Sequence, residues 1–580
     1  MTARTTASRR LIGLIAVAAA VFTSTGCVAI PDSSAPQPIE AFDRKLPVNA
    51  VPEPRRSDDP ETLVRNYVKA MADPSGGHSA ARKFLTDDAS KRWDDQGEMR
   101  IVDNVSVIVD ERTEAAVRLR ITADQVGRLS PEGQLLPASG ALVTPLTLRR
   151  VRGSWRINGD QLHGTITDRE QFLTAYRQAD LYFPDPSMSR LVTDPRWVFG
   201  ATPQATELLA RLLQGPSPDL SGAIGSGAEK GVSLSGPVSG DNGQLSIDLN
   251  NMVDGDAANR TVLAAQIIWT LDEAGITGPY TINADGAPLV ANHDHGWRTA
   301  DVQSFQPDPQ EAAAVPLHLV SDGKLLRTAG GRAVPVPGPL GDGRSVRNAA
   351  VTRDLSRAAV VEERDGKQVL LEGPYGAAPT EVTSGRVINS PTYVADSSDG
   401  YAVVDGHPVE WSVDGQGSVR SLELDISAVR EKAPGPITAM SVAPDGVRVA
   451  LVVSGRPMLA VVSTNERGLP SLTGVRPAAI DIDTAVQDIA WSTGSTLYAV
   501  RLGDETPVMR IPLAGGESSG LVGGNLKPPV TRVSASPATV YVTDTQGVQQ
   551  LGVGPGRTDQ YWTSVSPDTR SSTIPVIPGG

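Results

Sequence analysis

Two related stretches, VTRDLSRAAVV (Val351–Val361) and VAPDGVRVALVV (Val442–Val453), decide the fold of the C-terminal half of the chain. Each has Asp at its fourth position, Arg at its seventh and an apolar run behind them. Asp354 and Asp445 lie 91 residues apart, and SSDGYAVV places Asp399 about midway. A period of about 45 residues, with a turn joining two strands, is typical of propeller blades. We therefore assign the three aspartates to blade turns and expect their loss to lower stability rather than abolish a reaction.

Weaker copies continue the repeat at WSTGSTLYAV (Trp491–Val500), SASPATVYV (Ser534–Val542) and LHLVSDGKLLRTAGG (Leu317–Gly331). The last copy lacks a preceding inner strand, which DQYWTSV (Asp559–Val565) can supply by closing the ring. The pattern therefore predicts an all-β propeller over residues 315–565, with six blades favoured and five the next choice. Residues 306–314 are expected to be a linker, and residues 566–580 a flexible C-terminal tail.

Residues 181–305 are expected to form a separate α/β domain. It is introduced by a strand–turn–strand phrase, ADLYFPDPSMSRLVTDPRWVFG (Ala179–Gly200), and contains helices near Ala205–Leu213 and Thr261–Ala274. Four phrases occur in the order of the GerMN domain: LLARLLQGP, LSIDLN, AAQIIWTL and INADG. The region thus resembles GerMN domains of spore-germination and cell-envelope proteins. That resemblance implies an envelope setting and no established catalysis.

Residues 59–180 favour an α+β domain. Asp59 and Pro60 suit the cap and first turn of a helix, and a second helix is expected at about 79–93. Alternating runs then predict an antiparallel sheet: MRIVDNVSVIVD, TEAAVRLRITADQ and TPLTLRRVRGSWRING. Helices followed by a curved sheet fit an NTF2-like cone. Such cones often hold pockets, but a structural module without a ligand is the favoured interpretation.

The N-terminus has the layout of a secretory signal. MTARTTASRR is basic and LIGLIAVAAAVF (Leu11–Phe22) is apolar, but this run is shorter than the roughly 20 residues of a membrane span. Residues 1–26 are therefore expected to be a signal peptide. Seven prolines between Pro31 and Pro60 predict a semi-extended tether over residues 27–58.

Between signal and tether, TSTGCVAI (Thr23–Ile30) contains Cys27, the only cysteine of the chain. Small residues that run into a cysteine resemble a bacterial lipobox, although Ser24 stands where a large residue is usual. The resemblance implies signal cleavage between Gly26 and Cys27, with N-palmitoyl and S-diacylglycerol attachment at Cys27. The alternative is an ordinary exported protein in which Cys27 is a free thiol.

Composition excludes several function classes. The net charge of −13, without a Lys/Arg cluster interleaved with aromatics, argues against nucleic-acid binding. A single cysteine leaves no disulfide within the chain. With 57 Gly and 45 Pro among 580 residues, the chain is expected to be globular and rich in turns.

No catalytic constellation is present in the sequence, which contains no GxSxG elbow, Walker loop or HExxH motif. His293 and His295 form the only close histidine pair, and a metal site needs three or four convergent ligands. Asp248 and Asp254 could pair as carboxylates but are more readily explained as surface groups. We therefore predict no enzyme activity, no cofactor and no metal.

The whole chain resembles the family of actinobacterial LpqB lipoproteins, most specifically in LYFPDP and LVTDPRW. This resemblance implies a lipid-anchored protein on the extracytoplasmic face of the cell membrane. It also implies binding to the extracytoplasmic part of an MtrB-like sensor histidine kinase of a two-component system. Modulating that kinase would affect cell-wall homeostasis and division. Two alternatives stay open: a protein that binds cell-wall glycan or peptide, and a structural envelope scaffold.

Overall fold

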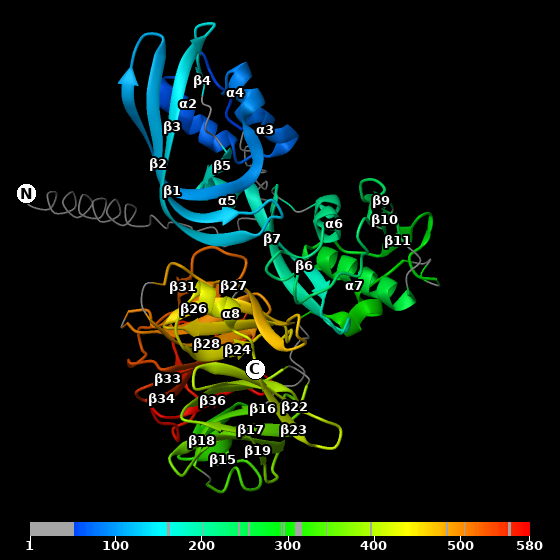
Figure 1. The fold of residues 1–580 in the computed structure, drawn as a ribbon, viewed down its shortest axis with the longest axis vertical. Coiled ribbons are helices and arrows are strands. Elements are labelled where there is room, and N and C mark those ends of the chain that lie inside the picture. The colour runs from blue at the N-terminus through cyan, green and yellow to red at the C-terminus, as the bar shows by residue number, and fades with distance from the viewer. Residues whose placement is uncertain are drawn as a thin grey trace, which may run out of the picture. The chain divides into compact units, whose positions relative to one another are not determined.

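The computed structural model describes residues 51–579 except 159–162, 201, 203, 242–243, 253–255, 292, 294–295, 308–315, 344, 395–396, 483–484, 504 and 555–557. Gly26, Cys27 and the expected signal peptide lie outside these residues. Within them, no helix has both the length and the apolar character required to cross a membrane. Figure 1 shows the arrangement of the elements.

The first domain combines helices with one sheet, as expected. The helices are α2 (Pro60–Ala70), α3 (Ser75–Arg82), α4 (Asp87–Arg92) and α5 (Arg169–Ala175). The sheet has the order β4 (Ser154–Ile157), β3 (Leu135–Val151), β2 (Ala116–Leu129), β1 (Asp94–Arg112) and β5 (His163–Asp168). The three runs expected to pair as antiparallel strands are confirmed in β1 to β4, and β5 adds a parallel pairing with β1. Asp59 caps α2 by accepting from the Thr62 N–H at 2.8 Å, as the sequence indicates.

The single helix expected at about 79–93 is instead two short helices. Gly76, Gly77 and His78 all have positive φ, so α3 is distorted near its start. The chain leaves α3 after Arg82, and Thr86 caps a new helix, α4, by accepting from the Ala89 N–H. The sequence pattern did not reveal this second start, because both pieces present small or apolar residues inward.

The second domain begins with an antiparallel pair, β6 (Tyr176–Pro184) and β7 (Leu191–Phe199), which confirms the strand–turn–strand prediction. Its other elements are α6 (Ala205–Leu213), β8 (Ser233–Leu234), β9 (Ser239–Asp241), β10 (Gln244–Asn250), α7 (Ala257–Glu273), β11 (Tyr280–Ala284), β12 (Ala287–Pro288) and the 3-10 helix η1 (Thr299–Phe305). Strand β10 pairs in parallel with β11. Helix α7 starts before the expected Thr261, since Asp256 provides its N-terminal cap.

The C-terminal region is a β-propeller whose described residues form six four-stranded sheets, each antiparallel. The first is β15–β14–β13–β36, and the other five follow in chain order from β16–β19 to β32–β35. Their bounds are β13 (His318–Ser321), β14 (Lys324–Ala329), β15 (Arg332–Pro335), β16 (Val346–Val351), β17 (Arg357–Arg364), β18 (Lys367–Pro374), β19 (Thr380–Gly385), β20 (Ile388–Tyr393), β21 (Gly400–Val404), β22 (His407–Val413), β23 (Val419–Glu423), β24 (Ile437–Val442), β25 (Arg448–Val453), β26 (Arg456–Thr464), β27 (Pro470–Pro477), β28 (Val486–Thr493), β29 (Thr496–Arg501), β30 (Val508–Pro512), β31 (Ser519–Gly520), β32 (Arg532–Ala535), β33 (Thr539–Asp544), β34 (Gly547–Gly552), β35 (Thr563–Ser564) and β36 (Ile574–Val576). A short helix, α8 (Ser427–Lys432), follows β23.

The ring closes differently from the prediction. Thr563 and Ser564, expected in the closing strand, form the outer strand of the last sheet. Closure instead comes from Ile574–Val576, which pairs with β13 and packs beside the inner strands β16 and β32. The expectation of a flexible tail over residues 566–580 is therefore wrong. The physical reason is burial: Val576 is 6% exposed on the axis side, whereas Tyr561, just before β35, is 69% exposed.

Neighbouring blades are held together by apolar side chains that project from both sheets. Between the second and third sheets, for example, Ala359, Val361 and Leu370 pack against Tyr393 and Trp411. Ala358 and Val360 of the same strand belong to the cluster on its opposite face, so β17 is buried on both faces. The inner strands therefore surround the axis without forming a continuous sheet.

Candidate functional site

Most residues that the sequence offered for metal or acid chemistry are not brought together. Asp248 accepts from the Asn283 Nδ2 at 2.9 Å near the surface, and its suggested partner Asp254 lies outside the described residues. His293 stacks on Trp297 with ring centroids 3.7 Å apart, while His295 lies outside the described residues. In the described part of the chain, no three His, Cys, Asp or Glu side chains gather as metal ligands would.

The three repeat aspartates serve the blade turns in different ways. Asp354 accepts from the Ser356 N–H at 3.0 Å, and Asp399 accepts from the Val413 N–H at 3.2 Å. Asp445 is the most buried of them and binds Arg448, whose side chain, like that of Asp445, is 4% exposed. All three contacts stay within one blade, which agrees with a structural role.

A cavity of about 310 Å³, here called the funnel, lies at the axis of the propeller. Its wall comes mainly from the inner strands β16, β20, β24, β28, β32 and β36. In β16, β20, β24 and β28 the pairing register shifts near the strand start, as it does at a β-bulge. Because a bulge re-aims the side chains beside it, polar residues near these shifts can turn toward the axis.

Several polar side chains in the wall accept hydrogen bonds from backbone N–H groups of the next inner strand. Ser390 Oγ accepts from the Met440 N–H at 3.2 Å, across from β20 to β24. Asp488 makes the same kind of contact from β28 to β32, accepting from the Val533 N–H at 3.0 Å. Such contacts satisfy edge-strand N–H groups that would otherwise be unpaired. They hold the blades at a fixed spacing around the funnel.

The charges in the funnel are few and unevenly partnered. The charged lining residues are Arg353, Asp488 and Arg532. Burial raises the pKa of the Asp488 carboxyl above its usual value, although the nearby Arg532 opposes this shift. Neither guanidinium has a hydrogen bond or ion pair with another residue of the described chain. The funnel therefore has cationic groups available to a ligand.

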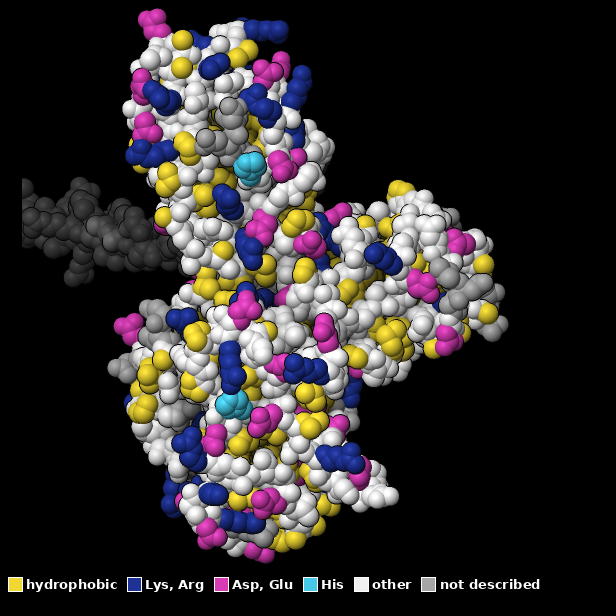
Figure 2. All heavy atoms as spheres, in the orientation of Figure 1, with side chains coloured by type: hydrophobic (Ala, Val, Ile, Leu, Met, Phe, Trp, Pro, Cys, Tyr) yellow, Lys and Arg dark blue, Asp and Glu magenta, His cyan; other side chains and the backbone are white. Residues whose placement is uncertain are grey.

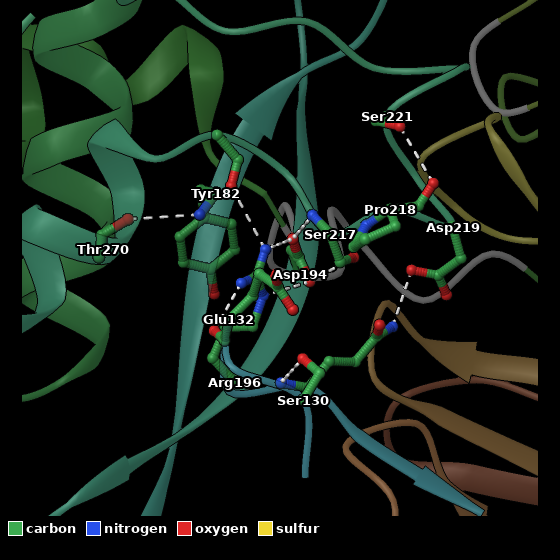
Figure 3. A network of polar contacts seen from close by, with 12 residues as sticks. Ser130, Glu132, Tyr182, Asp194, Arg196, Ser217, Pro218, Asp219, Ser221 and Thr270 are labelled. Atoms are coloured by element: carbon green, nitrogen blue, oxygen red, sulfur yellow. Dashed lines mark hydrogen bonds and ion pairs between the residues drawn. The ribbon is translucent and has the colours of Figure 1, made fainter. Parts of the chain in front are cut away.

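A second polar cluster joins the domains, which belong to one compact unit spanning residues 52–580. At its centre, Arg196 binds Asp194 through two hydrogen bonds of 2.9 and 2.6 Å, and both side chains are 1% exposed. Arg196 also donates to the Glu132 carbonyl of the first domain at 2.7 Å. Ser217 donates to Asp194 through its N–H and its hydroxyl. Figure 3 shows these contacts converging between β7 and the neighbouring loops.

Asp219 extends this cluster, here called the joint, to the propeller. It accepts from Gln134 of the first domain at 2.8 Å and from Arg476 of β27 at 2.8 Å. Burial alone would raise the pKa of Asp219, but Arg476, Gln134 and Ser217 outweigh it and hold the pKa below its usual value. Trp197 adds a hydrogen bond from its indole to the Ala514 carbonyl at 2.7 Å.

Close backbone approach also marks the joint. Gly474 of β27 has φ of 60°, and a Cβ there would lie 2.0 Å from the Asp219 carbonyl oxygen. The sequence reasoning missed Asp219, Gln134, Arg476 and Gly474 altogether. It did single out LVTDPRW, which contains Asp194 and Arg196. Two charged residues within a mostly buried strand were the available signal.

Comparison with known proteins covers the whole chain. It is 36% identical to Lipoprotein LpqB of Rhodococcus opacus (strain B4), with 99% of this chain and 98% of that protein aligned. It is also 36% identical to Lipoprotein LpqB of Mycolicibacterium smegmatis, with 98% of this chain and 100% of that protein aligned. The chain belongs to the LpqB lipoprotein family. As a lipoprotein of the LpqB family, it is a membrane-anchored envelope protein.

Three family matches divide the chain in the same way as the fold. Residues 53–173 match the LpqB N-terminal domain, residues 180–290 match the sporulation and spore germination family, and residues 323–578 match the LpqB beta-propeller domain. Among solved structures, a putative 6-phosphogluconolactonase from Bacteroides uniformis is 14% identical, with a TM-score of 0.30 over 43% of this chain and 81% of that chain. A likeness this low says nothing about activity.

On the face shown in Figure 2, Lys and Arg side chains are interspersed with Asp and Glu rather than gathered into a basic patch. This distribution fits the acidic composition of the LpqB family member described here.

Proposed function

We propose that this chain is a lipid-anchored accessory protein that binds and modulates an MtrB-like sensor histidine kinase of a two-component system. It acts on the extracytoplasmic face of the cell membrane, catalyses no reaction, and thereby affects cell-wall homeostasis and division. The observation that most supports this proposal is the alignment with LpqB lipoproteins along almost the full length of both chains.

Anchoring makes such a role physically reasonable. Two acyl chains at Cys27 would confine the protein to the membrane plane, where a kinase sensor domain also lies. The proline-rich residues 27–58 would then act as a tether. Confinement raises the effective concentration of both partners, so modest affinity suffices for binding. To change kinase output, the protein must contact one signalling state of the kinase more strongly than the other.

The joint favours a binding role for the whole unit. Contacts through Asp219 connect the first domain, the second domain and the propeller. A partner that binds any one domain is therefore held by the whole protein, which is anchored at the membrane. This requires no reaction at any site.

In-cell photocrosslinking tests the proposal. A photoreactive residue would be placed at Val143 in the first domain and at Leu422 and Tyr561 in the propeller, whose side chains are 59%, 52% and 69% exposed. We expect kinase adducts from one domain and few from the other. Recovery of no kinase from any position, with intact lipoprotein in the membrane fraction, would contradict the proposal. Wall defects on deletion with unchanged kinase output would favour the scaffold alternative.

A Cys27→Ala variant tests the anchor separately. We expect it to leave the membrane fraction and to lose the kinase adducts, because its effective concentration at the membrane falls. If the variant stays in the membrane as firmly as the wild type, lipid attachment at Cys27 is wrong.

A further inference from the structure

We propose that the propeller funnel binds a small organic oxyanion, a carboxylate or phosphate on a polar body of about monosaccharide size, and that Arg532 recognises the anionic group. The existence of this site does not depend on the function proposed above.

The size of the cavity sets the size of the ligand. A volume of about 310 Å³ is at the lower end of the roughly 300–1,000 Å³ typical of small-molecule sites. The cavity runs along the propeller axis and is enclosed by strands on all sides. A protein segment could insert there only as an extended tip, whereas a compact molecule can fill it.

The charge of the funnel differs in sign from that of the chain. The chain has a net charge of −13, but the funnel is lined by two arginines and one acid. Arg532 is the first residue of β32, and the polar residues Asn348 and Ser390 line the same cavity from the first halves of β16 and β20. Arg353 lies two residues after the end of β16, at the other end of the inner strands.

Arg532 is the better recognition group because its neighbours leave it available. Arg532 is partly buried and makes no hydrogen bond or ion pair with another described residue, although its charge acts on the nearby Asp488. A guanidinium presents a planar fork of donors that fits a carboxylate or phosphate with two hydrogen bonds. Partial removal from water without a partner is costly, and an oxyanion would relieve that cost.

Asp488 is the acidic lining residue that could compete with an anionic ligand for Arg532. Its carboxyl accepts from the Val533 N–H at 3.0 Å and the Ile489 N–H at 3.1 Å, so its lone pairs are directed toward the strands. Asp488 is partly buried in the funnel wall, and this burial favours its neutral form. It therefore competes for Arg532 less than a solvated aspartate would.

The rest of the wall suits a polar body with apolar faces. Met440, Ile489 and Trp491 supply apolar surface. Hydroxyl groups of Ser390 and Ser534 lie among them, and each makes one of the hydrogen bonds available to a hydroxyl. Each hydroxyl can make a further hydrogen bond to ligand hydroxyls or amides.

Titration calorimetry on the full lipoprotein in detergent micelles tests the site with three probes that have related sugar bodies. N-acetylmuramic acid carries a carboxylate, N-acetylglucosamine 1-phosphate carries a phosphate, and N-acetylglucosamine is neutral. We expect saturable binding of one or both anionic probes, at least about tenfold tighter than the neutral sugar. The preferred anion identifies carboxylate or phosphate as the natural group. Equal binding of the neutral sugar, or no binding of either anion, would overturn the proposal.

Variants then assign the recognition to Arg532. Arg532→Gln should weaken the anionic probes about tenfold, whereas the exposed Arg420→Gln, on the outer strand β23, should leave them unchanged. Asp488→Asn should strengthen binding, since its amide can still accept from Val533. If Arg532→Gln lowers the melting temperature, Arg532→Lys keeps the charge but loses the fork and should still weaken binding. Unchanged affinity in a folded Arg532 variant would refute the assignment.

Discussion

The joint and the propeller funnel both bury charged groups, but they treat them in opposite ways. At the joint, Asp194 and Arg196 are almost fully buried and bind each other through two hydrogen bonds, and Asp219 has partners in two other domains. In the funnel, Arg353 and Arg532 make no hydrogen bond or ion pair with another described residue. We call the joint a closed network, because its charges bind other groups of the protein, and the funnel an open one, because its arginines are available to a ligand.

This difference separates charges that hold the molecule together from charges that can bind something else. A closed buried pair contributes little net stability but is costly to break, because the remaining partner is stranded. Removing a cation that makes no hydrogen bond or ion pair breaks no such contact of the fold, so it should cost little stability. Variants in the two regions should therefore change different measurements, stability at the joint and ligand affinity in the funnel.

The largest effect is expected from Arg196→Met. This change leaves Asp194 buried with only Ser217 as partner and should lower the free energy of unfolding by about 3–5 kcal/mol. Equilibrium urea unfolding of the full chain would measure it. Arg128→Met is the matched control, because its pair with Glu98 has side chains 43% and 46% exposed and should cost no more than about 1 kcal/mol.

The comparison also predicts a partial rescue. Replacing both members, as Arg196→Met with Asp194→Leu, removes the stranded charge and should recover part of the stability lost in the single variant. If Arg196→Met alone unfolds at the wild-type urea midpoint, the closed network does not have the role assigned to it here.

A smaller effect is expected from Gly474→Ala. The new Cβ would collide with the Asp219 carbonyl oxygen and should destabilise the propeller side of the joint by about 1–3 kcal/mol. Hydrogen exchange at residues 132–136 and 514–517 should speed up as the domains part. Gly468→Ala is the control, since Gly468 also has positive φ but nothing lies within 4 Å of its Cβ position. Equal exchange in both variants would mean that the positive φ, not the close approach, causes the effect.

The propeller could be predicted from the sequence because its information is local and repeated. Each hairpin carries its own turn residues, and Asp354, Asp399 and Asp445 recur in those turns. The closing strand could not be predicted, since Ile574–Val576 is only three residues long and is defined by pairing with β13, far away in the chain. A strand of that length has no period of its own to recognise.

The joint was hidden for a related reason. Asp219 lies 85 residues from Gln134 and 257 residues from Arg476, and none of the three belongs to a repeat. Only the Asp194 and Arg196 pair left a local trace, as charges within a buried strand. The funnel is intermediate, because Asn348, Ser390, Asp488 and Arg532 occur near equivalent strand starts. Register shifts lie beside Asn348, Ser390 and Asp488, and the sequence does not reveal such shifts.

The smallest effect concerns pH, and here the two regions should respond with opposite sign. The pKa of Asp219 is lowered in the fold, so its stabilising contribution is present above the ordinary value of 3.8 and is lost as pH falls through the lowered pKa. The pKa of Asp488 is raised, so the fold is favoured below 3.8 and that advantage is lost as pH rises through the raised pKa.

Asn variants of these two residues would reveal the two signs in unfolding measurements from about pH 3 to pH 7. Asp219→Asn should lose stability relative to the wild type mainly at the upper end of this range, because Arg476 then lacks an ionised partner. Asp488→Asn should match the wild type at the lower end and gain on it toward neutral pH, because the amide never ionises within the funnel. Parallel pH profiles for the two variants would show that both carboxylates are in equivalent environments, and the distinction between a closed joint and an open funnel would then fail.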